Sequence, residues 1–122
     1  MASEDIRAQA MVTSPSFKAA VAAFDQDFDR LVNDIVTLTE IPAPPFGEKG
    51  RSDVYLRLLR ESGLEDVQTD AAGNVMGLWR GQGGAPLLAV AAHLDTVFPA
   101  ETDVKVKRAG TTLCAPGVGD DG

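Results

Sequence analysis

The 122-residue sequence predicts an α/β fold in which two helices are followed by a mixed sheet. Apolar residues recur at alternating steps of four and three between positions 17 and 38, which indicates a long amphipathic helix. An unbroken apolar run from Leu87 to Ala92 ends abruptly at His93. Such a run is typical of a central parallel strand that helices cover on both faces.

The first helix is expected to begin at Ser14, because Ser is a favoured N-cap and Pro15 suits the first helical position. Residues 1–13 are polar and lack a period, so we expect a flexible leader there. The apolar positions of the helix are Phe17, Val21, Phe24, Phe28, Leu31, Ile35 and Leu38. We favour a core-facing helix, since Val32 and Val36 widen the apolar stripe, but the same heptad also permits a coiled-coil dimer.

The proline-rich segment 41–45 ends this helix, because proline lacks an N–H group and restricts the residue before it. A second helix is expected from Lys49 to Ser62, with Gly63 as the left-handed residue that ends it. Its predicted buried face consists of Val54, Tyr55, Leu58 and Leu59.

The remaining segments predict strands. Residues 67–70 and 75–79 read as a pair joined by the turn 71–74, and the glycine-rich turn 81–84 leads into the central strand. Segments 103–108 and 111–114 read as a hairpin. We therefore expect one domain over residues 14–122.

Composition excludes several classes of partner. The chain has 18 acidic and 11 basic residues and a net charge of −7, which argues against nucleic acid and against an anionic membrane surface. No apolar run approaches the ~20 residues that span a bilayer, and no secretory signal is visible. The single Cys114 suits a reducing compartment, so we expect a cytoplasmic protein.

A candidate metal site follows the apolar run. Ligand sites of open α/β sheets lie beyond the carboxyl ends of the strands, where His93 falls. Asp95 is two residues on and shares its face, so it can orient the ring and leave one nitrogen for a metal. The glycine-rich loop 115–119 then delivers Asp120 and Asp121. A histidine among carboxylates suits Zn²⁺, Mn²⁺ or Co²⁺ better than Ca²⁺.

Two motifs together resemble a known family. His-Leu-Asp-Thr-Val-Phe-Pro at 93–99 and Ala-Pro-Gly-Val-Gly-Asp-Asp-Gly at 115–122 resemble the co-catalytic zinc peptidases. That family includes peptidase T, the glutamate carboxypeptidases, acetylornithine deacetylase and succinyl-diaminopimelate desuccinylase. The resemblance implies that His93 is a metal ligand, that Asp120 bridges two zinc ions, and that Asp95 is the catalytic residue that orients His93.

The sequence also departs from the family. The family's general-base glutamate and its other metal ligands lie further along a chain of some hundreds of residues. We therefore expect the N-terminal part of a zinc-peptidase catalytic domain, from a binuclear metallopeptidase that cleaves the amide bond of small peptides. By itself the chain should be inactive.

Two other readings stay open. One is part of an N-acyl amino acid deacylase, which would share both motifs. The other is a non-catalytic α/β association module that uses the heptad helix as its interface. In each case an incompletely covered sheet should favour a homo-oligomer.

Overall fold

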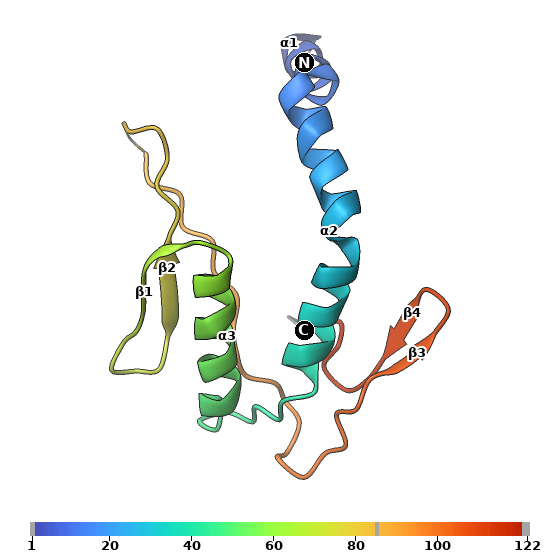
Figure 1. Cartoon of the computed structure of the whole chain (residues 1–122), viewed down its shortest axis with the longest axis vertical. Helices are drawn as coiled ribbons and strands as arrows, with labels where there is room; N and C mark the ends of the chain where they lie inside the picture. The colour runs from blue at the N-terminus through green and yellow to red at the C-terminus, as the bar shows by residue number, and fades with distance from the viewer. Residues whose placement is uncertain (1, 85, 121–122) are drawn as a thin grey trace. The chain divides into compact units, whose positions relative to one another are not determined.

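The computed structural model describes residues 2–84 and 86–120, which contain three helices and two small antiparallel sheets (Figure 1). The elements are α1 (Ala2–Thr13), α2 (Pro15–Thr39), α3 (Lys49–Glu61), β1 (Glu65–Thr69), β2 (Val75–Leu78), β3 (Lys107–Ala109) and β4 (Thr112–Cys114). This content agrees with the predicted α/β class. The chain divides into two compact units, one ending at Asp34 and the other beginning at Ile35.

The first unit contains α1 and most of α2. The sequence predicts a flexible leader where the structure has α1, and the reason is composition: Ala8, Gln9, Ala10 and Met11 are all good helix formers. Ser14 separates the two helices. Its Oγ accepts a 3.2 Å hydrogen bond from the backbone N–H of Phe17, which confirms the predicted N-cap of α2.

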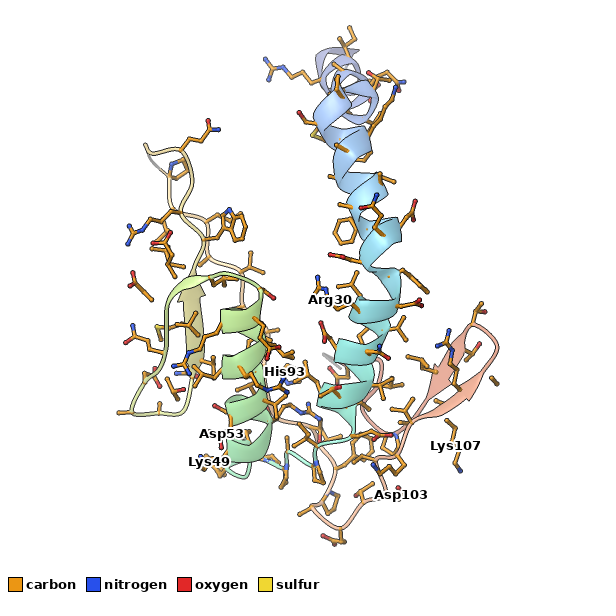
Figure 2. All side chains as sticks on the ribbon, in the orientation of Figure 1. Arg30, Lys49, Asp53, His93, Asp103 and Lys107 are labelled. Atoms are coloured by element: carbon orange, nitrogen blue, oxygen red, sulfur yellow. The ribbon has the colours of Figure 1, made fainter. Side chains whose placement is uncertain are left out.

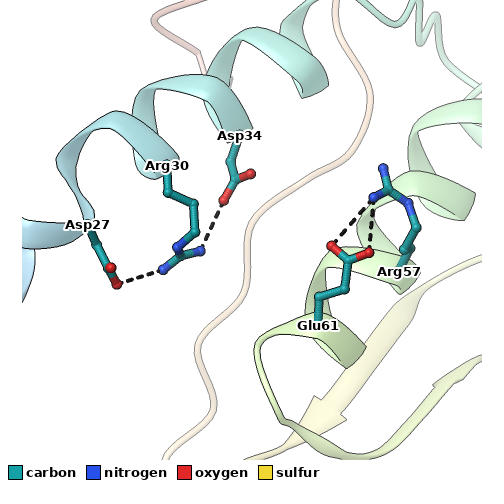
Figure 3. Close-up of polar contacts among 5 residues, drawn as sticks. All are labelled: Asp27, Arg30, Asp34, Arg57 and Glu61. Atoms are coloured by element: carbon teal, nitrogen blue, oxygen red, sulfur yellow. Dashed lines mark hydrogen bonds and ion pairs between the residues drawn. The ribbon is translucent and has the colours of Figure 1, made fainter.

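The predicted core-facing stripe of α2 is exposed along its first half. Phe24 and Phe28, for example, are 66% and 58% exposed. The charged residues of this helix pair along its surface, where Arg30 contacts Asp27 at 3.0 Å and Asp34 at 3.2 Å (Figure 3). Such exposed ion pairs add little stability to the helix. The apolar face of this half of α2 is unburied.

The second unit is organised by α3 and the hairpin of β1 and β2. The helix ends as predicted at Gly63, which has φ +80°, and Leu64 N–H donates to the carbonyl oxygen of Leu59 at 3.2 Å. β1 and β2 then pair antiparallel, and both contact α3. Gly77 permits this packing, because a Cβ atom there would lie 3.0 Å from the Leu64 side chain.

The predicted mixed sheet is wrong. β1–β2 and β3–β4 are two separate two-stranded sheets, and the described residues 86–96 belong to no strand. Leu87, Leu88 and Val90 are 85%, 83% and 90% exposed. A central strand needs hydrogen-bonding neighbours on both edges and cover on both faces. Each described hairpin pairs only within itself and supplies neither, so the apolar run lies exposed.

The most buried residues of the second unit lie where three segments meet. Ala43 is fully buried after α2, Arg51 and Ser52 are buried at the start of α3, and Thr96 is buried beyond the apolar run. The N–H of Thr96 donates to the carbonyl oxygen of Ala43 at 2.7 Å. This junction fixes the segment that carries His93 and Asp95.

A second contact lies at the end of α2. The Glu40 carboxylate accepts hydrogen bonds from the Val106 N–H at 3.0 Å and from Lys105 Nζ at 2.8 Å. The segment that leads to β3 is thereby tied to the helix end. These bonds also hold the pKa of Glu40 below its ordinary value, the Lys105 contact contributing most.

Candidate metal site

The structure brings His93, Asp95 and Asp120 together. His93 Nδ1 lies 2.8 Å from the backbone carbonyl oxygen of Asp95 and 3.3 Å from its Oδ1. On the other side of the ring, Nε2 lies 3.3 Å from Asp120 Oδ1. Asp121 lies outside the described residues. The three predicted site residues are thus neighbours, although the strand expected to present two of them is not formed.

The environment of the ring fixes where its proton lies. The carbonyl oxygen of Asp95 can only accept a hydrogen bond, so Nδ1 carries the hydrogen that meets it. When the neutral ring carries its proton on Nδ1, Nε2 faces the Asp120 carboxylate at 3.3 Å. A second ring proton, or a cation shared by the two atoms, would make this contact favourable.

The spacing of the two donor atoms suits a metal. Zinc binds histidine nitrogen and carboxylate oxygen at about 2.0–2.2 Å in tetrahedral geometry, which puts two ligand atoms about 3.4 Å apart. The observed separation of Nε2 and Oδ1 is 3.3 Å. An ion pair with a protonated ring fits the same distance, so metal titration has to separate the two. Within residues 2–84 and 86–120, no group of three or more His, Cys, Asp or Glu residues is placed to hold an ion.

Arg51 is a site residue that the sequence reasoning missed. It is only 3% exposed, and its Nη1 and Nη2 donate to the carbonyl oxygens of Leu94 at 3.1 Å and Ile41 at 3.0 Å. Burial lowers the pKa of Arg51, and the nearby Asp95 carboxylate opposes that shift. Because Leu94 lies between His93 and Asp95, Arg51 positions the backbone of both. A single buried arginine on a helix produces no periodic pattern in the sequence, so Arg51 could not be predicted as a site residue.

Gly117 positions Asp120. It has φ +82°, a left-handed conformation that favours glycine, and a Cβ atom there would lie 3.3 Å from Thr96 Cγ2. The loop therefore packs closely on Thr96, which is itself bonded to Ala43. Asp120 N–H then donates to the carbonyl oxygen of Gly117 at 3.2 Å, in a turn that directs the chain back toward His93.

An open groove of about 1120 Å³ adjoins the site. It runs between the first turns of α3, the turn 70–74 and residues 90–95. Figure 2 shows His93 beside α3, with Lys49 and Asp53 at the N-terminal end of that helix. Lys49 Nζ and Asp53 Oδ2 form an exposed ion pair of 2.6 Å at the groove. Residues that line it include Arg51, Tyr55, Asn74, Val90 and His93. A small polar molecule can therefore approach His93 from the solvent.

Comparison with known proteins does not identify a family. A scan against protein-family models gives no match to the chain, and no curated protein is significantly similar to it. None of the described helices is both long enough and apolar enough to cross a membrane. Cys114 is a free, exposed thiol.

Proposed function

We propose that this chain is the N-terminal part of a metal-dependent hydrolase that cleaves the amide bond of small peptides. One observation carries the proposal: Nδ1 of His93 lies 2.8 Å from the Asp95 carbonyl oxygen, while Nε2 faces Oδ1 of Asp120 at 3.3 Å. Segments 93–99 and 115–122 resemble the co-catalytic zinc peptidases, and this resemblance is the reason to interpret His93 and Asp120 as metal ligands. A cytoplasmic location belongs to the same proposal and is supported by the single cysteine.

The residues of the candidate site would divide into metal ligands and residues that orient them. His93 Nε2 and an Asp120 oxygen would hold a divalent ion, for which Zn²⁺ fits best and Mn²⁺ or Co²⁺ are alternatives. Asp95 would orient the ring, through its backbone carbonyl as well as its carboxylate. Arg51 would hold the intervening Leu94 in place. When bound, zinc would polarise the scissile carbonyl and activate water for attack.

The same residues also limit what the chain does alone. A catalytic zinc usually has three protein ligands, and hydrolysis needs a base to take a proton from water. In the proposed site His93 and Asp120 would supply two ligands, and the Asp95 carboxylate faces the opposite ring nitrogen of His93. Among the described residues, no group of three or more possible ligands is placed to hold an ion. We therefore propose that these 122 residues supply about half of a two-metal site and bind the ion weakly. Activity would require the remaining ligands and the base of the family.

Metal titration tests the proposal. Co²⁺ added to the purified chain should produce visible absorption bands of a nitrogen- and oxygen-ligated ion, and His93→Ala and Asp120→Asn should each weaken binding at least tenfold. Asp103→Asn is the matched control, because it removes an equal charge from a different loop. No Co²⁺ signal, or one indifferent to His93→Ala, would refute the metal site.

Activity is measured separately on dipeptides, tripeptides and N-acyl amino acids. The chain alone should show no metal-dependent turnover on any of them. Turnover that disappears in His93→Ala would show that the half-site suffices and that the stated need for a further base is wrong. A preference for N-acyl amino acids would then favour the deacylase over the peptidase.

A further inference from the structure

The first half of α2 carries an exposed apolar seam. The seam consists of Phe17, Val21, Phe24 and Phe28, which are 39%, 46%, 66% and 58% exposed. Their spacing of four, three and four residues places them on one face of the helix. Contiguous apolar surface of this kind marks an interaction site in a water-exposed protein.

We propose that this seam pairs antiparallel with the same seam of a second copy of the chain. The three phenylalanine rings alone expose on the order of 300 Å² per copy, if a whole ring side chain contributes ~200 Å². A specific dimer buries about 800 Å² per partner. Val21 and the flanking side chains therefore have to contribute as well, which requires contact along the whole seam rather than at one end.

Charges on one flank of the seam fix the direction of the pairing. Lys18 and Asp25 are seven residues apart and lie on the same side of the seam. In an antiparallel pair centred between Val21 and Phe24, Lys18 of each copy lies opposite Asp25 of the other. The symmetry creates this pair twice. A parallel pair would set Lys18 level with Lys18 and Asp25 level with Asp25, and complementarity would be lost.

The other flank is compatible with the same arrangement. In the antiparallel pair Asp27 of one copy lies near Ala20 of the other, so no carboxylates face each other across the dimer. Asp27 also stays available for its ion pair with Arg30 of its own helix. Antiparallel helices further oppose their macrodipoles, which parallel helices do not.

Sedimentation velocity of the 122-residue chain across a range from about 1 to 200 µM tests the pairing. We expect reversible dimerisation, and Phe24→Ser should raise the dimer dissociation constant about 10- to 100-fold, because a central aromatic anchor is lost. Position 24 is exposed in the single chain, so helix content measured by circular dichroism should stay nearly unchanged. A chain that stays monomeric throughout, or a dimer indifferent to Phe24→Ser, would overturn the proposal.

A charge-exchange cycle tests the direction. Lys18→Asp and Asp25→Lys should each weaken the dimer about three- to tenfold, and the double variant should restore it. Asp29→Lys is the matched control, since it reverses the same charge on the same helix away from the seam. Single variants that weaken the dimer without rescue by the double variant would exclude the antiparallel arrangement.

Discussion

The N–H of Thr96 donates a 2.7 Å hydrogen bond to the carbonyl oxygen of Ala43, and both residues are buried. This bond joins the proline-rich turn after α2 to the segment that carries His93 and Asp95. Gly117 packs closely on the Thr96 side chain, in the loop that brings Asp120 to the ring. The geometry of the candidate site therefore depends on a junction of small buried residues, and substitutions at this junction should act on the site from a distance.

Arg51→Met should destabilise the second unit by about 2–3 kcal/mol, because the carbonyl oxygens of Leu94 and Ile41 lose charged donors in a buried setting. Urea denaturation followed by circular dichroism measures this loss. The matched control is Arg57→Met, which removes an exposed ion pair with Glu61 and should cost less than about 1 kcal/mol (Figure 3). Equal losses in the two variants would contradict the positioning role of Arg51.

Gly117→Ala should weaken Co²⁺ binding, because the new Cβ meets Thr96 Cγ2 at 3.3 Å and shifts the loop that carries Asp120. Gly110→Ala separates this effect from backbone strain. Gly110 also has a positive φ, of +62°, but its Cβ would meet nothing within 4 Å. Both variants should lose about 1–2 kcal/mol of stability, and only Gly117→Ala should reduce metal affinity. Unchanged affinity in Gly117→Ala would show that the loop does not set the site.

Acid should weaken the contact between Glu40 and the 105–106 segment. The folded pKa of Glu40 lies below its ordinary value of 4.5, so its stabilising effect is complete above pH 4.5. It is lost as the pH falls through the lower folded value. Glu40→Gln should therefore flatten the loss of stability below pH 4.5, measured as the thermal midpoint at successive pH values. Glu61→Gln is the control, because it removes a carboxylate from an exposed pair on α3 and leaves the Glu40 contact in place.

The tautomer of His93 can be read directly, because it is the single histidine of the chain. Nitrogen-15 spectra of the neutral ring should show the proton on Nδ1, where the Asp95 carbonyl oxygen accepts it. Asp95→Asn should keep this tautomer, since the accepting oxygen belongs to the backbone. A proton on Nε2 would contradict the proposed ligand role of that nitrogen.

Local rules predicted the elements of this fold well. Ser14 at the N-cap of α2, Gly63 at the end of α3 and the turn 71–74 all act through neighbours in sequence, so their signals are present in short segments. The central strand was wrong because its evidence was only apolarity. The apolar run from Leu87 to Ala92 indicates side chains that are more stable when other elements bury them. The sequence does not show whether the rest of the chain supplies those elements, and in the structure the run is exposed.

The candidate site was predictable in part for the same reason. His93 and Asp95 are two residues apart, and Asp120 follows a glycine-rich loop. These motifs and this spacing are visible in the sequence, so all three could be predicted as site residues. Arg51 acts on a carbonyl oxygen 43 positions away along the chain. No local pattern encodes such a contact.

The exposure of Leu87, Leu88 and Val90 has a thermodynamic consequence for the residue that follows them. His93 follows this exposed stretch closely in sequence, so any surface that pairs with the stretch would also restrict the backbone of His93. Ion binding and pairing would then be linked equilibria, each changing the affinity of the other by the same factor. Metal affinity measured on the chain alone would accordingly differ from that of an assembly in which the apolar run is covered.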